Sequence, residues 1–423
     1  MPILLLSIFV NYIFGAYLIK RKSRIVFAIA IAFDLGLLGY FKYANFFIDN
    51  ISSAFFDNQL LNPKIALPLA ISFFTFQKIA YIVDCMQGKL RDRNFLNYAL
   101  FVTFFPQLIA GPIVHHKDII PQFKTLRTKF IDYNNIALGI FIFAVGLFKK
   151  VIIADHFAIL ANYGFDSYLH LSMLDSWKAS LSYTAQLYFD FSGYTDMAIG
   201  SALIFNIKLP FNFNQPYKSL NIKEFWQRWH MTLSKFLRDY LYIPLGGNRV
   251  GEVRIYANLM IVFLISGLWH GAGWTFIFWG FLHGIAICIH HFYSKIGFKM
   301  YKILAWFLTF NFINITWVFF RAHHFEQAIV ILRKMFGIDF VTLGLHENWQ
   351  FILQFIRFNK IGYLVLVFSL FLAYKLLPYI TKDAESLTKE FKMNGNFRFI
   401  TICLLAIPIL SFHKTSEFLY FNF

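Results

Sequence analysis

Residues 224–249 read EFWQRWHMTLSKFLRDYLYIPLGGNR, a run rich in charged side chains within a chain that is otherwise strongly apolar. The chain has 423 residues, of which 58% are hydrophobic and only 14% are charged. Soluble domains carry about 25% charged residues, and so few polar groups do not cover the surface of a soluble fold. The composition therefore predicts an all-α, polytopic membrane protein.

The charged run itself predicts an amphipathic helix. Asn221 and Glu224 have the spacing of a capping box, so we expect the helix to begin there. Pro244 and the two glycines that follow it should end the helix. At 100° per residue the aromatic side chains fill one face and the charged side chains fill the other. A basic helix of this kind usually lies in the headgroup plane of a membrane, so interfacial anchoring explains its charges as well as substrate binding does.

Two histidines stand out from this apolar background. Helical geometry places His230 on the apolar face, between Trp226 and Ser234, where it is either a satisfied core residue or a functional one. His270 lies within SGLWHGAGWTFIFWGFLHG, residues 266–284. An ionisable residue at membrane depth is costly and is usually functional, although it also occurs as a buried cap of a kinked helix. The glycines around His270 are expected to break the helix and to free backbone amides near the imidazole.

Two carboxylates also fall at membrane depth, Asp190 and Asp196 in YFDFSGYTDMAIG, residues 188–200. They indicate either a cavity that water reaches or structural partners for a break in the helix. The two interpretations stay open at this point.

The formal net charge of +17 arises from 39 Lys and Arg against 22 Asp and Glu. Cytoplasmic loops of membrane proteins carry such an excess, and no long basic run is present, so we expect contact with membrane lipid and no binding of nucleic acid. The three cysteines lie far apart without CxxC spacing, so the sequence predicts no metal site.

Stretches long enough to cross roughly 30 Å of hydrocarbon predict about eleven membrane segments. They lie at residues 3–19, 25–46, 65–84, 96–114, 135–154, 176–206, 255–269, 273–293, 302–321, 361–380 and 397–412. A basic cluster at residues 20–24 places the end of the first segment in the cytoplasm.

One segment conflicts with this topology. The loops at residues 86–94 and 115–130 are both basic, so both prefer the cytoplasm, and a single span between them cannot satisfy both. The prolines and glycine within residues 96–114 favour a re-entrant segment, which enters the membrane and returns to the same side.

Taken together, these motifs closely resemble the membrane-bound O-acyltransferase superfamily. Within it, the resemblance is to the bacterial alginate O-acetyltransferase branch, which includes the membrane subunit of peptidoglycan O-acetylation. The histidine motifs, FPQLIAGPI, YFDFSGYTDMAIG, LPFNFNQPY and the terminal FLYFNF occur in the expected order, so we expect one integral-membrane acyltransferase domain over residues 1–423. Members of the branch usually begin with a further apolar stretch, so the N-terminal part is expected to be shorter than the family norm.

The resemblance implies a fold, a donor and an acceptor. The fold is a ring of tilted helices around a central tunnel, in the bacterial cytoplasmic (inner) membrane. The donor substrate is cytoplasmic acetyl-CoA, with no bound cofactor, and the acceptor is a hydroxyl on an exported glycan such as peptidoglycan or alginate. A secreted or membrane-anchored SGNH-type acetyltransferase or esterase is the expected partner.

The resemblance also assigns residues. His270 matches the essential histidine and is expected to be the general base, and His230 matches the second motif position. His230 or an amide near Gly271 is expected to polarise the thioester carbonyl. Candidate substrate-binding residues are Trp226, Arg228, Trp229, Ser234, Arg238, Asn248, Arg249, Trp269, Asp190 and Asp196.

Two other functions compete with acetyl transfer. The related branch that transfers D-alanyl groups to teichoic acid shares both histidine motifs, although the fuller YLYIPLGGNR text favours acetylation. A proton-coupled transporter or flippase is a different class, in which Asp190, Asp196 and His270 would form a proton relay. Internal inverted repeats, which would favour transport, are absent from the sequence.

Overall fold

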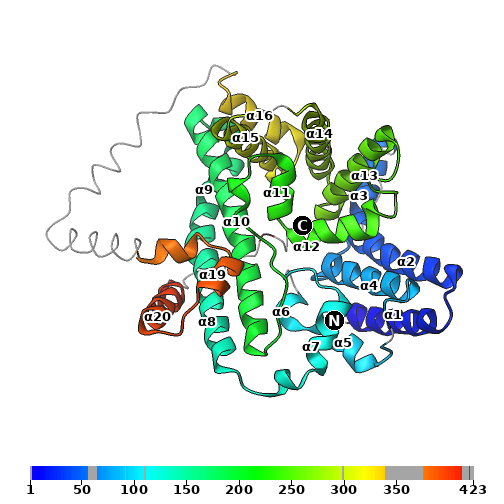
Figure 1. The fold of residues 1–423 in the computed structure, drawn as a ribbon. Helices are drawn as coiled ribbons and strands as arrows, with labels where there is room; N and C mark the ends of the chain where they lie inside the picture. The colour runs from blue at the N-terminus through cyan, green and yellow to red at the C-terminus, as the bar shows by residue number, and fades with distance from the viewer. Residues whose placement is uncertain are drawn as a thin grey trace.

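The computed structural model describes residues 2–55, 64–90, 92–108, 111–297, 300–338, 375–411 and 419. Over these residues the secondary structure is entirely helical, which confirms the predicted class (Figure 1). Six helical rods among them are long and apolar enough to cross a membrane. They are α1 (Pro2–Lys20), the rod Arg24–Phe55, the rod Tyr133–Asp166, α13 (Glu252–His270), α14 (Trp274–Ile296) and α15 (Lys302–Arg321).

Several of the eleven expected segments are shorter than the membrane is thick. α4 (Ile71–Met86) and α20 (Gly395–Leu410) have 16 residues each. At a rise of about 1.5 Å per residue, each extends roughly 24 Å, less than the roughly 30 Å of hydrocarbon. Of the segment expected at 361–380, only residues 375–380 are among those that the structure describes.

The segment predicted to be re-entrant is broken. α5 (Phe95–Thr103) has nine residues, too few to cross the membrane, and the four-residue α6 (Phe105–Leu108) follows it. The two basic loops that flank this segment meet, because Asp92 forms an ion pair with Lys124 at 2.6 Å between nitrogen and oxygen. The ion pair brings the two loops together on one side of the protein, which favours the re-entrant interpretation.

The largest helix, α10 (Met173–Ile204), lies beside α8 (Tyr133–Phe148) and α9 (Asp155–Asp166) (Figure 1). α8 and α10 touch at their backbones, since a Cβ on Gly193 would lie only 2.7 Å from the carbonyl oxygen of Gly146. Glycine is required at this contact because any side chain would push the two helices apart.

The two carboxylates at membrane depth are ion-paired on this interface. η3 (Lys149–Ala154), a π-helical turn between α8 and α9, supplies two lysines. Lys149 lies 2.7 Å from Asp196, and Lys150 lies 2.5 Å from Asp190. Of the two interpretations left open by the sequence, these contacts favour structural partners over a water-filled cavity.

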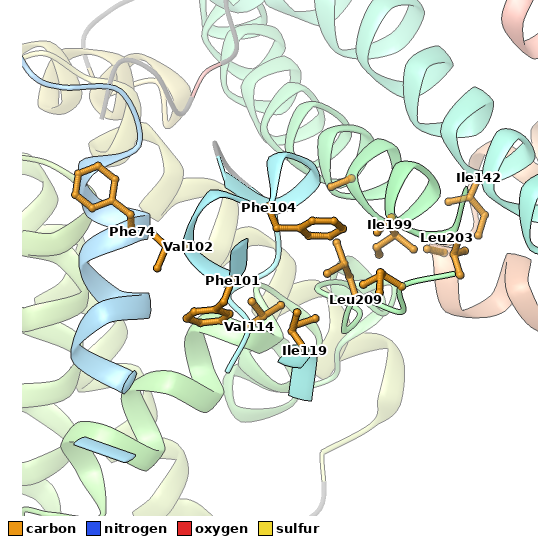
Figure 2. Close-up of a cluster of buried hydrophobic side chains, with 14 of the residues drawn as sticks. Phe74, Phe101, Val102, Phe104, Val114, Ile119, Ile142, Ile199, Leu203 and Leu209 are labelled. Carbon is orange, nitrogen blue, oxygen red and sulfur yellow. The ribbon is translucent and has the colours of Figure 1, made fainter. Parts of the chain in front are cut away.

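A cluster of buried hydrophobic side chains joins the N-terminal helices to α8 and α10. Figure 2 shows these side chains in a continuous row from Phe74 on α4, through Phe101 and Phe104, to Leu203 on α10 and Ile142 on α8. The row anchors the broken re-entrant segment against the rest of the protein. The charged motif lies beyond it, in the middle of the view in Figure 1, with helices around it as the resemblance implies.

Candidate functional site

The charged motif forms two short helices. α11 (Ile222–Arg228) begins as expected after Asn221, whose side chain accepts a hydrogen bond from the Glu224 amide at 2.8 Å. The expected continuous helix to Pro244 is wrong, because α12 (Met231–Leu237) begins anew after a break at His230. The backbone of His230 has φ +44° and ψ +52°, a left-handed conformation that is uncommon for a residue with a side chain.

An extended segment from LPFNFNQPY stabilises this break. The amide of Asn214 donates to the carbonyl of Arg228 at 2.9 Å, and the amide of Met231 donates to the carbonyl of Asn212 at 3.0 Å. These bonds satisfy backbone groups that a continuous helix would have paired internally. A distant segment therefore decides where α11 ends.

Asn212 also fixes the tautomer of His230. Its Oδ1 accepts hydrogen bonds from the Thr232 amide at 3.2 Å and the Thr232 hydroxyl at 2.9 Å, and it lies 3.0 Å from His230 Nδ1. Since a backbone amide only donates, this atom is the oxygen, and His230 Nδ1 must carry the proton. His230 Nε2 then holds a lone pair, and it is buried without a hydrogen-bond partner among the described residues.

Burial keeps His230 in this neutral form. The ring is fully buried, outside the six long apolar helices, and burial lowers its pKa to about 3. His230 is therefore a hydrogen-bond or proton acceptor at Nε2. The expectation that it polarises a carbonyl by donating a proton does not fit this tautomer.

His270 is the last residue of α13, and the helix break predicted from the glycines is confirmed at Gly271. Its ring packs against Trp269, Trp279 and Phe320, with centroid distances of 4.9, 5.2 and 5.2 Å. The residue is only 3% exposed. The second motif therefore places an imidazole in an aromatic shell at the turn between α13 and α14.

The two candidate histidines meet at one indole ring. The Trp269 ring lies 4.9 Å from His270 and 6.2 Å from His230, centroid to centroid. The indole nitrogens of Trp269 and Trp279 are buried, and neither has an acceptor among the described residues. Indole N–H groups only donate, so the site combines a lone pair on His230 with two hydrogen-bond donors.

A pocket of about 550 Å³ lies between α11, α12, α13 and α14. Four of the predicted binding residues line it, namely Trp226, Ser234, Arg238 and Asn248. Its lining also includes the basic residues Lys223, Lys235, His290 and His291, together with Ser266 and Ser294.

The pocket extends toward His270 without including it. Ser266 lies four residues before His270 on α13, so both side chains are on the same face, one helical turn apart. The cationic side chains and the apolar wall of Trp226 suit an anionic ligand with an uncharged arm.

The other predicted binding residues lie outside this pocket lining. Trp229 is buried in aromatic packing, 5.2 Å from the Trp317 ring. Arg228 forms an ion pair with Glu224, one helical turn earlier on α11, at 2.7 Å, and Arg249 is exposed. Asp190 and Asp196 are held by the lysines of η3, and Trp269 lies between the histidines.

His283 is a structural residue. Its Nδ1 accepts a hydrogen bond from Trp226 Nε1 at 3.2 Å, and its Nε2 lies 3.0 Å from the Thr316 hydroxyl. Both ring nitrogens thus have partners, and the ring holds Trp226 at the pocket wall.

The sequence analysis missed Asn212 and the pocket residues Lys235, Ser266, His290 and His291. Two signals were available. Asn212 lies within a quoted motif, LPFNFNQPY, and His290 lies seven residues after His283, on the same face of α14.

Comparisons with known proteins show the family of the chain. The family model described as MBOAT, membrane-bound O-acyltransferase family, matches residues 86–326, more than half of the chain. The chain is 46% identical to a peptidoglycan O-acetyltransferase of Helicobacter pylori, over 100% of this chain and 88% of that protein. It is 42% identical to a probable alginate O-acetylase, AlgI, of Pseudomonas aeruginosa, over 85% and 67%. A teichoic acid D-alanyltransferase of Bacillus subtilis is 30% identical, over 61% and 70%.

Proposed function

The chain belongs to the membrane-bound O-acyltransferase family, and on this premise we propose that it O-acetylates a cell-wall glycan or exopolysaccharide outside the cytoplasmic membrane of a bacterium. Acetyl-CoA is the proposed donor. The relative that matches the whole chain is named for peptidoglycan, so peptidoglycan is the acceptor to test first. The observation that carries the proposal is the cationic pocket, which ends one helical turn from His270.

The pocket is accessible to a cytoplasmic donor if its mouth lies on the basic face of the protein. An ion pair joins the loops 86–94 and 115–130. Asp118 of the second loop lies 4.0 Å from Lys235, which lines the pocket. The basic loops therefore lie next to the pocket lining, and from the excess of Lys and Arg there we expect this side to face the cytoplasm.

The cations of the pocket suit the phosphates of coenzyme A. Lys223, Lys235 and Arg238 converge from α11, α12 and the π-helical turn η6 (Arg238–Tyr242), and His290 faces them from α14. Phosphate oxygens accept charge-assisted hydrogen bonds from such groups. With the phosphates held there, the uncharged pantetheine arm points along Trp226 and Ser266 toward His270.

We assign the role of general base to His270. The acceptor hydroxyl transfers its proton to the imidazole while its oxygen forms a bond to the thioester carbonyl carbon. The C–S bond then breaks, and the thiolate of coenzyme A takes the proton from the imidazolium. The acetyl group ends on the glycan, or first on an SGNH-type partner that delivers it to the glycan.

The negative charge on the carbonyl oxygen needs donors, and the indole N–H groups of Trp269 and Trp279 supply them in this proposal. Both rings contact His270, and both nitrogens lack an acceptor in the described part of the chain. Buried donors aimed at a developing charge are worth more than donors in water. His230, with its lone pair at Nε2, accepts a hydrogen bond from the substrate.

The base is tested with a His270→Ala variant at equal abundance in membranes. In proteoliposomes loaded with radiolabelled acetyl-CoA, we expect acetyl transfer to peptidoglycan fragments to fall by about 10²–10⁴-fold, the usual contribution of a general base. The exposed His170 provides a matched control, because His170→Ala should retain full activity. Normal transfer by the His270 variant would remove this residue from the mechanism.

The donor is tested by its affinity for the pocket. Arg238→Gln should raise KM for acetyl-CoA with little change in kcat, because it removes a contact to phosphate remote from the reacting atoms. Arg254→Gln is the control, since Arg254 is exposed on the first turn of α13 and does not line the pocket. Reaction with a D-alanyl carrier thioester, and none with acetyl-CoA, would instead assign D-alanyl transfer.

The transporter alternative receives no support from the carboxylates. Its proposed relay needs Asp190 and Asp196 to exchange protons with His270. Each carboxylate instead has a lysine partner within 2.7 Å, and both lysines belong to the π-helical turn η3.

A further inference from the structure

The end of α13 that carries His270 is held by two consecutive residues from a distant segment. A helix leaves its last carbonyl groups without donors inside the helix. Here the Tyr43 hydroxyl donates to the carbonyl of Leu268 at 2.7 Å. The Lys42 ammonium donates to the carbonyl of Trp269 and, at 3.3 Å, to the carbonyl of His270. Three successive carbonyls are thus bound from outside, and we call these contacts the α13 clamp.

Lys42 is an unusual residue for this position. It is only 8% exposed and lies in the middle of the rod Arg24–Phe55, which is long and apolar enough to cross the membrane. Its described hydrogen-bond acceptors are all neutral oxygens, the two carbonyls and the Ser72 hydroxyl at 3.2 Å. An ionisable side chain at such depth is costly, which marks it as a candidate functional residue.

Two physical effects favour Lys42 at the end of α13. The carboxyl end of a helix carries partial negative charge, so a cation next to it is stabilised. The ammonium nitrogen also lies 5.7 Å from the centre of the Trp269 ring, within the range of a cation–π interaction. Lys42 also belongs to the π-helical turn η1 (Gly39–Tyr43), and such helix irregularities often occur at functional sites.

The α13 clamp restrains the last turn of the helix. The helix ends at His270, and the chain continues through Gly271 and Gly273, two residues whose backbone has more conformational freedom than that of other residues. An unrestrained last turn frays, and fraying would move the imidazole by more than catalysis tolerates.

We propose that Lys42 and Tyr43 are positioning residues, which hold the His270 ring in its productive place by fixing the last turn of α13. This inference rests on the proposed function, since it states what the α13 clamp contributes to acetyl transfer. Neither residue needs to touch a substrate.

Three variants test the proposal in the full-length protein. Lys42→Met removes the ammonium group and retains the length of the side chain, and Tyr43→Phe removes only the hydroxyl. Lys78→Met is the control, because Lys78 is a second buried lysine, on α4, that donates to the Ser7 hydroxyl and contacts the Phe74 ring. Amide hydrogen exchange over residues 264–273, followed by mass spectrometry, reports on the clamp without any substrate. The kcat and KM for acetyl-CoA show whether the clamp contributes to acetyl transfer.

In Lys42→Met we expect exchange over residues 264–273 to quicken by about tenfold or more, because the turn loses two hydrogen bonds. Tyr43→Phe should show a smaller increase, and Lys78→Met should resemble the unmodified protein. We expect kcat to fall about ten- to a hundredfold in Lys42→Met, with KM for acetyl-CoA unchanged.

Two results would overturn the proposal. Unchanged exchange in Lys42→Met would show that the clamp does not hold the turn. Faster exchange with unchanged kcat would show that the clamp has no part in positioning His270. If the unmodified protein itself transfers no acetyl, the proposed function fails, and the exchange comparison still decides whether the clamp exists.

Discussion

Asn212 offers the sharpest test of how the site is built, because one oxygen atom accepts three hydrogen bonds. Asn212→Leu replaces the amide with an apolar group of similar size. It removes the acceptor of three donors: His230 Nδ1 and the Thr232 amide, whose N–H bonds have fixed directions, and the Thr232 hydroxyl, which can rotate to another partner. Each buried donor without a partner costs about 1–3 kcal/mol. We therefore expect the free energy of unfolding to fall by roughly 2–6 kcal/mol.

The activity of the same variant should fall as well. Without Asn212 Oδ1, nothing fixes the proton of His230 on Nδ1, and the lone pair at Nε2 is no longer guaranteed. If the loss of orientation raises the activation free energy by about 2.7 kcal/mol, kcat falls by roughly a hundredfold. Asn212→Asp retains an oxygen at this position, so it should preserve most of the stability.

The assay is denaturant unfolding in detergent, followed by tryptophan fluorescence, together with acetyl transfer in proteoliposomes. A Leu variant as stable and as active as the unmodified protein would refute the assigned hydrogen bonds. Equal destabilisation by the Leu and Asp substitutions would show that retaining an oxygen at this position does not preserve the stability.

Two further predictions concern packing and pH. Gly280→Ala should lower the free energy of unfolding by about 1–3 kcal/mol, because its Cβ would lie 2.3 Å from the Phe263 carbonyl oxygen. Gly395→Ala, which meets open space, should be near neutral in the same denaturant unfolding assay. Burial lowers the pKa of His116 from 6.5 to about 4, so its contribution to stability is complete above pH 6.5 and declines as the pH falls toward 4. His116→Phe, which should pack against Phe101, should flatten this decline between pH 6.5 and pH 4 in a pH series of unfolding curves.

Composition and local motifs were enough to predict the fold class and several helix boundaries. The excess of apolar residues predicted a helical membrane protein, and Asn221 predicted the start of α11. The glycines after His270 predicted the end of α13. Each of these features depends on neighbours in sequence, so a local pattern carries the information.

The break at His230 was not predictable in the same way. Helical periodicity runs through residues 222–242 without interruption, so the local pattern favoured one helix. The partner that stabilises the break is the segment around Asn212, eighteen residues earlier, whose contact arises only in the folded protein. Lys42 did carry a local signal, since it is a lysine within an otherwise apolar segment. What it binds, however, lies more than two hundred residues away.

The paired charges between η3 and α10 also bear on how the protein enters the membrane. Lys149 is synthesised before Asp196 and gains this counter-charge only when α10 arrives, whereas Lys150 has Asp155 at 2.9 Å within its own rod as well as Asp190 on α10. Until then, the Lys149 ammonium group would lie in the membrane without this carboxylate, which is strongly unfavourable. We therefore expect the α8–α9 rod and α10 to leave the insertion machinery together, with cooperative biogenesis over this part of the chain.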